Sequence, residues 1–294
     1  MSRRGLILFA AVSIIWGVPY LFIRIAVESV SPAFVAWSRV TIGAAVLLPL
    51  AVHRGSLRGL WPRRGWLVAF AALEMALPFF LIAWGERYVA SSLAAILVAS
   101  LPIIVAALSL RFDPGERPTG PRLFGLALGI VGVVLLVGID LAGEVPELVG
   151  ALSILTATCC YAGGSLIVKR QLSDLPALGP VAAALALSSL MLMPSGVWLR
   201  PKGIPSTDAL VSIGVLGLIC SAVALLLYFA LITEVGPARA TVIGYTTPIV
   251  AVVLGVALLD ERLTTSAIVG VLLVLAGSYL ATKAHQGRTL ARGS

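Results

Sequence analysis

Two apolar stretches of the chain carry the same order of polar side chains at helical spacing. The first stripe consists of Ser13, Trp16, Tyr20 and Arg24. The second consists of Thr158, Tyr161, Ser165 and Lys169. Steps of three or four residues place each set on one face of a helix. Such faces suit a small solute, because a ring stacks against its apolar part while hydroxyls bind its polar end.

The alternative interpretation of the two stripes is interfacial anchoring, since Trp and Tyr favour the boundary between lipid and water. Trp16 and Tyr161 lie too deep in their apolar stretches for that role. We therefore favour a cavity wall, with Tyr20 compatible with either role. The two rings hold equivalent positions, so we expect Trp16 and Tyr161 to approach each other near the midplane.

A carboxyl lies inside a third apolar stretch. Glu74 follows Trp66 by eight residues, which places it roughly 12 Å deep in an apolar core about 30 Å thick. A charge there costs on the order of 2.5–3.5 kcal/mol unless it is paired or hydrated. Glu74 is thus a proton-coupling carboxyl, a ligand for a substrate amine, or a protonated structural group. Arg39 is either its partner or a cation that reaches the outer surface. Further substrate-binding candidates on this stretch are Pro78 and Phe79.

Pro102 and Pro248 each lie inside an apolar stretch. A proline removes the helical hydrogen bond to the carbonyl four residues earlier, here Val98 and Gly244. A hydroxyl two residues before each proline can bind the freed groups. The break either exposes polar backbone to a midplane cavity or is a packing kink. The polar residues beside Pro248 favour the site. The candidates here are Ser100, Tyr245 and Thr246.

The composition predicts a membrane protein. Of the 294 residues, 60% are hydrophobic and 12% are charged, whereas a soluble domain is about half apolar and a quarter charged. A spanning helix needs about 20 apolar residues. On that criterion we predict an all-α integral membrane protein with ten transmembrane helices, at residues 5–27, 33–53, 66–85, 90–110, 122–139, 148–168, 178–199, 208–231, 236–258 and 265–283.

The basic residues set the orientation. The net charge of +8 comes from Lys and Arg between the apolar stretches and at both ends, a distribution that favours membrane orientation over nucleic-acid binding. Most of them fall on one side if the N-terminus is cytoplasmic. The connection from Asp140 to Glu147 contains three acids and no base, so we place Glu144 outside. Both termini are therefore predicted to be cytoplasmic.

The chain also repeats itself at a shift of 145 or 146 residues. This shift superposes Pro102 on Pro248 and Glu116-Arg117-Pro118-Thr119 on Glu261-Arg262-Leu263-Thr264. We predict two five-helix repeats, residues 1–143 and 144–294. Five is odd, so the repeats are inverted, as in many secondary transporters that bind substrate at the midplane. Small residues for scaffold or dimer packing are Gly125, Gly129, Gly132, Gly270 and Gly277.

These residues resemble the EamA domain, which defines exporters of the drug/metabolite transporter superfamily. The resemblance rests on Ile15-Trp16-Gly17, on Thr246-Thr247-Pro248 and on Asp260-Glu261-Arg262, and within the family it is similar to the YddG-type amino-acid exporters. The resemblance implies ten helices, cytoplasmic termini, and a central cavity lined mainly by the first, third and fourth helices of each repeat. One departure is Arg111-Phe112-Asp113-Pro114 where the second repeat has Leu258-Leu259-Asp260.

The function that follows is secondary export of small organic metabolites across a bacterial-type inner membrane by alternating access, with amino acids, including aromatic ones, as the favoured substrates. Its partners are a small solute and membrane lipids, with protons as a further candidate. The alternatives are an exporter of unrelated drugs or metabolites, and an intramembrane enzyme or lipid-handling protein. The sequence contains none of the common catalytic or phosphate-binding motifs and no metal-binding spacing. We therefore predict no enzyme activity, no cofactor and no metal.

Overall fold

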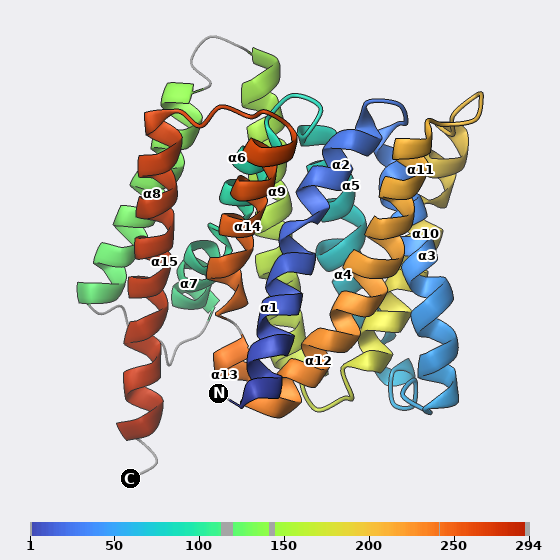
Figure 1. Ribbon diagram of the computed structural model, residues 1–294. Helices are drawn as coiled ribbons and strands as arrows, with labels where there is room; N and C mark the ends of the chain where they lie inside the picture. Colours follow the sequence, from blue (N-terminus) through green and yellow to red (C-terminus); the bar gives the residue numbers. More distant parts are fainter. Residues whose placement is uncertain (1, 113–119, 141–144, 241, 292–294) are drawn as a thin grey trace.

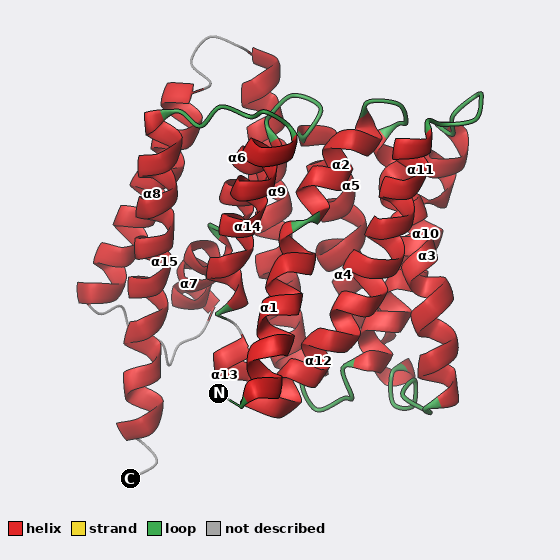
Figure 2. Ribbon diagram, viewed as in Figure 1, coloured by secondary structure: helices red, strands yellow, loops and turns green. Residues whose placement is uncertain are grey.

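The computed structural model describes residues 2–112, 120–140, 145–240 and 242–291. Over these residues the chain folds into helices joined by short loops, without a strand (Figures 1 and 2). The prediction of an all-α chain is confirmed for this part of the protein. The start of α1 and the end of α15 lie at the same end of the helix assembly (Figure 1). The prediction for Glu144 lies outside the described residues.

Seven helical spans among the described residues are long and apolar enough to cross a membrane. They run over Arg3–Val27, Pro32–His53, Trp61–Gly85, Ser91–Leu108, Val145–Leu172, Leu178–Trp198 and Thr207–Val235. Three shorter apolar helices, Leu123–Val137, Ile243–Leu258 and Thr265–Ala281, fall at the other three predicted positions. The helices thus lie where hydropathy places them, and seven of them reach the length of a span.

Several spans consist of more than one element. The helices are α1 Arg3–Gly17, α2 Pro19–Val27, α3 Pro32–His53, α4 Arg64–Ala71, α5 Leu77–Gly85, α6 Ser91–Val98, α7 Leu101–Phe112, α8 Gly120–Asp140, α9 Val145–Ile167, α10 Leu178–Trp198, α11 Thr207–Gly214, α12 Ala224–Val235, α13 Pro237–Ala240, α14 Ile243–Leu258 and α15 Thr265–Ala291. The short helix η1, Trp61–Arg63, precedes α4.

The two predicted prolines occupy different positions in their helices. Pro102 does not kink a continuous helix, because α6 ends at Val98 and Pro102 is the second residue of α7. At that position the missing N–H has no helical partner to lose. Pro248 lies inside α14, as predicted. Pro19 begins α2 and so interrupts the first span, which the hydropathy pattern had suggested to be continuous.

Three spans contain a π-helical segment, in which the turn is widened by one residue. These segments are η2 Ala72–Ala76, η3 Val168–Leu172 and η4 Val215–Val223. Wide turns are common at functional sites because they leave carbonyls to be bound by side chains. The segment η2 carries Glu74, and η4 carries Ser221, whose hydroxyl donates to the Leu216 carbonyl five residues earlier, at 2.9 Å.

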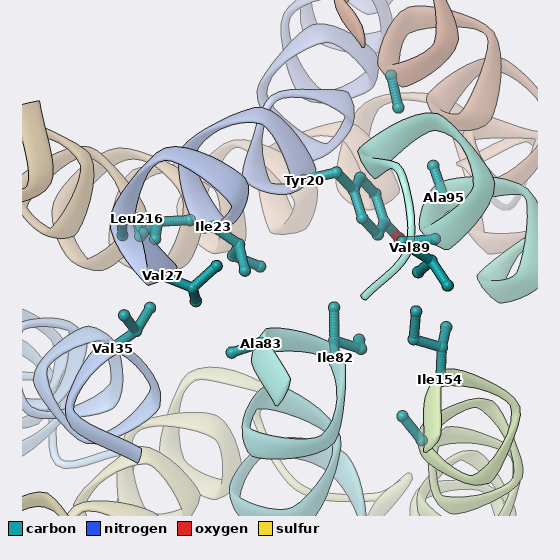
Figure 3. Close-up of a cluster of buried hydrophobic side chains, with 14 of the residues drawn as sticks. Tyr20, Ile23, Val27, Val35, Ile82, Ala83, Val89, Ala95, Ile154 and Leu216 are labelled. Carbon is teal, nitrogen blue, oxygen red and sulfur yellow. The ribbon is translucent and has the colours of Figure 1, made fainter. Parts of the chain in front are cut away.

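A cluster of buried apolar side chains joins the two halves of the chain. Figure 3 shows Tyr20 beside Val89 and Ala95, with Ile82 and Ile154 next to them. The cluster extends through α2 and α3 to Leu216 of η4. Elements from both halves therefore share one core.

Helices α8 and α15 pack against each other along their length through facing glycines (Figure 1). A Cβ at Gly277 would lie 2.6 Å from the Gly125 carbonyl and 2.6 Å from the Gly129 nitrogen. A Cβ at Gly132 would lie 2.9 Å from the Gly270 carbonyl. The predicted packing role of these glycines is thus intramolecular, because only a hydrogen side chain lets the two backbones approach this closely.

Gly277→Ala should lower the thermal unfolding temperature of the purified protein in detergent. The added methyl would meet backbone atoms that cannot rotate away, and overpacking of this kind costs about 1–3 kcal/mol. The matched control is Gly214→Ala, since nothing lies within 4 Å of a Cβ at Gly214. There the gain in helix propensity of up to about 1 kcal/mol should raise the unfolding temperature or leave it unchanged. A Gly277→Ala variant as stable as wild type would contradict this account of the α8–α15 contact.

Candidate functional site

The first polar stripe meets the second half of the chain. The Ser13 hydroxyl lies 2.8 Å from the Thr246 hydroxyl of α14, and the two share a hydrogen bond. The Trp16 ring packs on the Tyr228 ring of α12, with 4.7 Å between ring centroids. Helix α1 thus contributes a polar contact and an aromatic contact, each with a different helix of the other half.

Gly17 makes this contact between α1 and α14 possible. A Cβ at Gly17 would lie 2.6 Å from Val250 and 3.1 Å from the Thr247 carbonyl. Only glycine fits between the two helices at this crossing. Ser13 lies one turn before Gly17, and Thr246 lies one turn before Val250. The close approach at Gly17 therefore brings Ser13 within hydrogen-bonding distance of Thr246.

Trp16 has Tyr228, not Tyr161, as its aromatic partner. The reason is that the helices carrying Trp16 and Tyr161 have different neighbours: α1 packs on α12 and α14, whereas α9 packs on α5, α6 and α7. Tyr161 instead packs against the cluster that contains Tyr20. Sequence reasoning missed Tyr228, since a single aromatic residue in an apolar stretch carries no local signal of its partner.

Three predicted hydroxyls bond to backbone carbonyls three or four residues earlier in the chain. Thr158 is fully buried and donates to the Ile154 carbonyl at 2.9 Å. Ser100 donates to Leu97 at 2.6 Å, and Thr246 is close enough to donate to Ile243 at 3.1 Å. The prolines were predicted to free the carbonyls of Val98 and Gly244, but the hydroxyls bind the carbonyls one residue earlier. Thr158 and Ser100 therefore have a structural use in this conformation.

The other predicted residues are buried to different degrees. Tyr20 is buried, with 8% of its surface exposed, and belongs to the core cluster. Pro78 is buried near the start of α5. Three further candidates are half-buried: Phe79, Ser165 and Tyr245.

Glu74 lies against the other half of the chain. Its side chain contacts the backbone of α9 at Gly164, where a side chain would collide with the carboxylate. Among the described residues, the buried Oε2 atom has no hydrogen-bond partner. Tyr161 and Tyr228 lie within electrostatic range of this carboxylate. Glu74 is therefore an acid with an unused acceptor among aromatic side chains.

Arg39 neither pairs with Glu74 nor reaches the outer surface. Its side chain is buried, with 8% exposed. The Nε atom donates to the Ser221 hydroxyl at 3.0 Å, and the guanidinium carbon lies 3.9 Å from the centroid of the Phe79 ring. A hydrogen bond and a cation–π contact thus hold a permanent cation inside the helix assembly.

A second buried acid lies where α5 ends. Glu86 is fully buried, and neither of its carboxylate oxygens has a hydrogen-bond partner in the part of the chain that the structure describes. Its backbone carbonyl accepts a hydrogen bond from Arg24. The neighbouring Glu261 binds the backbone N–H groups of Ser91 and Ser92, at 2.7 and 3.0 Å, and so joins the segment after α14 to the start of α6. The sequence did not single out Glu86, because a carboxyl after an apolar stretch is usually solvated.

Burial raises the pKa of Glu86 well above its ordinary value of 4.5, and the nearby Glu261 carboxylate adds to the rise. The cations Arg24 and Arg39 oppose it. The Tyr20 phenol also lies within electrostatic range of Glu86. The burial of this acid therefore favours its neutral form.

A cavity of about 650 Å³ lies away from these groups, between the end of α3, the start of α10 and one face of α12. Its wall includes Arg54, Leu226 and Phe229, and none of the predicted site residues. In the part of the chain that the structure describes, no three His, Cys, Asp or Glu side chains are grouped to hold a metal ion.

The model of the EamA-like transporter family matches the chain twice, over residues 3–138 and 148–283. The chain is 33% identical over 285 residues to the uncharacterized inner membrane transporter YedA of Escherichia coli (strain K12), covering 92% of this chain and 90% of that protein. It is 25% identical over 290 residues to a probable amino-acid metabolite efflux pump of the same strain, covering 95% of each. It is 26% identical to the uncharacterized transporter YvbV of Bacillus subtilis (strain 168), covering 99% of this chain and 96% of that protein.

One crystal structure of a protein with 19% sequence identity superposes with a TM-score of 0.66. The superposition covers 96% of this chain and 98% of the other. At this identity the likeness shows a common fold and carries no information on substrate.

Glu86→Gln should change how stability depends on pH. The folded protein keeps the Glu86 proton to higher pH than the unfolded chain does, so its stability should fall as pH rises above about 4.5. The amide cannot ionise and should remove this loss. Unfolding temperatures measured from pH 5 to pH 8 should therefore fall less steeply for Glu86→Gln than for wild type, by a few degrees, because about 1 kcal/mol corresponds to roughly 2–4 °C.

The control is Glu28→Gln, which alters an exposed carboxyl at the end of α2 and should leave the wild-type pH profile unchanged. If Glu86→Gln keeps the full wild-type slope, the carboxyl at position 86 is ionised in the folded protein and this assignment is wrong.

Proposed function

Because this chain belongs to the EamA-like transporter family, we propose that it is a secondary exporter of small organic metabolites in the bacterial inner membrane. Amino acids, including aromatic ones, are the substrates that we favour. The transport cycle is alternating access between two inverted five-helix repeats. Both termini lie in the cytoplasm, on the side that carries most of the Lys and Arg.

The observation that carries the proposal is the joining of aromatic and polar side chains from both halves in the apolar interior. Trp16 packs on Tyr228, and Ser13 bonds to Thr246, so each pair spans the two halves. Lipid offers such groups no partner, which explains why they face inward. A substrate that separates the halves would replace these contacts with its own ring and polar groups.

The contacts between α8 and α15 support an inverted repeat. The 145-residue shift equates Gly125 with Gly270 and Gly132 with Gly277. In the structure Gly125 meets Gly277, and Gly132 meets Gly270. Two equivalent elements related by a twofold axis must exchange their contacts in this crossed way. Parallel repeats would instead pair each glycine with its own equivalent in the other half.

Other paired features agree with the same axis. Helix α1 packs on α12, and the corresponding α9 packs on α5. The π-helical segments η2 and η4 overlap when shifted by 145 residues. Ser100 and Thr246 each bond to the carbonyl three residues earlier. Two halves with matched contacts have two arrangements of similar energy, which favours inward-open and outward-open states over a static scaffold.

The favoured substrate class follows from the side chains in this apolar interior. Rings such as Trp16, Tyr161 and Tyr228 suit an aromatic or apolar substrate side chain. Glu74 suits an amine or a proton. The name of one relative, a probable amino-acid metabolite efflux pump, agrees with this choice. The YddG-type resemblance remains part of the proposal.

A transport screen tests the function. Purified protein in liposomes is supplied in turn with each radiolabelled amino acid and with a set of unrelated drugs and metabolites. We expect saturable uptake of amino acids, highest for aromatic ones, with no requirement for ATP. Uptake confined to non-amino-acid solutes would overturn the substrate class, and no uptake of any solute would overturn transport of this kind.

Trp16→Ala, Tyr161→Ala and Tyr228→Ala should each raise the apparent KM for the best substrate about fivefold or more. An aromatic contact contributes about 0.5–1.5 kcal/mol beyond area burial, and lost burial adds about 25 cal/mol per Å². Trp61→Ala is the control, because Trp61 is 77% exposed at the start of η1 and its loss should leave the KM unchanged. If all three interior variants fold and transport with wild-type KM, the rings do not bind substrate.

A further inference from the structure

We propose that Arg39 is the binding site for a substrate carboxylate, and that together with Glu74 it selects zwitterionic amino acids. The inference rests on the proposed function and names the two charged contacts of its site. Arg39 belongs to α3, the second helix of the first half, which the family resemblance does not place among the helices that line the cavity.

The guanidinium of Arg39 is held in place before any ligand binds. Its Nε donates to the Ser221 hydroxyl at 3.0 Å, and that hydroxyl in turn donates to the Leu216 carbonyl. One face of the guanidinium lies on the Phe79 ring. A hydroxyl has one proton to donate, so Ser221 is fixed as an acceptor for Nε. Fixing Nε and one face orients the two terminal nitrogens, which form the fork that binds a carboxylate through two parallel bonds.

No acid of the described residues neutralises this cation. The ion pairs in that part of the chain are Arg4–Glu234 and Arg63–Asp174. Glu86 lies within electrostatic range of Arg39, yet both of its carboxylate oxygens lack a partner. A buried charge without a counter-ion is costly in an apolar interior, and such intramembrane charges are typical of substrate pathways. An anionic ligand group would relieve this cost.

Glu74 supplies the second contact, and its span also carries Phe79, the ring on which Arg39 lies. The Tyr161 phenol is within electrostatic range of both Arg39 and Glu74. Glu74 Oε2 is buried and has no partner, so it can accept from an ammonium. A solute with a carboxylate and an ammonium group satisfies both side chains at once. A ligand with one of the two groups leaves the other side chain buried and unmatched.

The two π-helical segments explain why these charges are available. Glu74 belongs to η2, and Ser221, which holds Arg39, belongs to η4. The segments overlap under the 145-residue shift. Both charged side chains belong to the first half, and the second half contributes Ser221, which anchors Arg39. A carboxylate bound to Arg39 thus depends on a residue of each half, as alternating access requires.

Binding of three phenyl compounds to the purified protein tests the proposal. L-Phenylalanine carries both charges, 3-phenylpropionate carries only the carboxylate, and phenethylamine carries only the ammonium. Affinities are measured by titration calorimetry in detergent for wild type, Arg39→Gln and Glu74→Gln. Each preparation must first elute as a single folded species in size-exclusion chromatography.

Arg39→Gln should lower the affinity for L-phenylalanine and 3-phenylpropionate about tenfold or more, because these ligands lose a hydrogen bond between charged groups. The affinity for phenethylamine, which has no carboxylate, should not change. Glu74→Gln should weaken L-phenylalanine and phenethylamine but not 3-phenylpropionate. Arg87→Gln is the matched control, since Arg87 is exposed and also lies over a ring, that of Tyr88, at 5.9 Å. It should bind all three compounds as wild type does.

The carboxylate site would be wrong if Arg39→Gln lowered the affinity for all three compounds equally, or for none of them. It would also be wrong if the wild-type protein bound none of the three compounds. If Arg39→Gln does not fold, Ser221→Ala tests the carboxylate site instead. Loss of the hydrogen bond to Nε should lower the affinity for the two carboxylates and leave the affinity for phenethylamine unchanged. The proposed function is judged separately by the transport screen. If amino acids are taken up but Arg39→Gln does not change the binding of carboxylates, the proposed function stands and the Arg39 site is wrong. If 3-phenylpropionate binds through Arg39 but no amino acid is taken up, the site stands and the proposed function is wrong.

Discussion

The structure depends on one constraint: polar groups placed among apolar helices in a membrane must find their partners inside the protein. Ser13 shares a hydrogen bond with Thr246, and Thr158 donates to a carbonyl of its own helix. The Ser221 hydroxyl donates to the Leu216 carbonyl and accepts from Arg39. The groups that remain unmatched are informative for the same reason. Among the described residues, one carboxylate oxygen of Glu74 has no hydrogen-bond partner and the Arg39 guanidinium has no acid, and the proposed ligand would bind both.

Close helix contacts through glycine make these matches possible. Gly17 brings α1 to α14, and Gly164 accommodates the Glu74 side chain against α9. The crossed contacts of Gly125 and Gly132 tie α8 to α15. Only glycine permits these distances, so small residues set how closely the helices that carry Ser13 and Glu74 approach their neighbours. Scaffold and site are therefore parts of one packing arrangement, and the paired contacts give the proposed repeats their common axis.

Hydropathy and family resemblance predicted the helical class, the positions of the apolar helices and membership in the EamA-like family, all of which are confirmed. The breaks at Pro19 and before Pro102 were harder to predict from the sequence, because a proline near a helix start and one inside a helix look alike in an apolar stretch. Tyr228 and Glu86 were missed for a different reason. Their importance comes from what another helix places beside them, and neither periodicity nor composition carries that information.

Thiol accessibility at position 161 tests alternating access through this interior most directly. Tyr161→Cys is made in a variant whose native cysteines, Cys159, Cys160 and Cys220, are serines, and is treated with a membrane-impermeant thiol reagent in right-side-out and inside-out vesicles. The account predicts labelling from each side, at rates that change in opposite directions when L-phenylalanine is added, because the site is open to one side at a time. A cysteine at 161 that stays unlabelled from both sides, with and without L-phenylalanine, would contradict it.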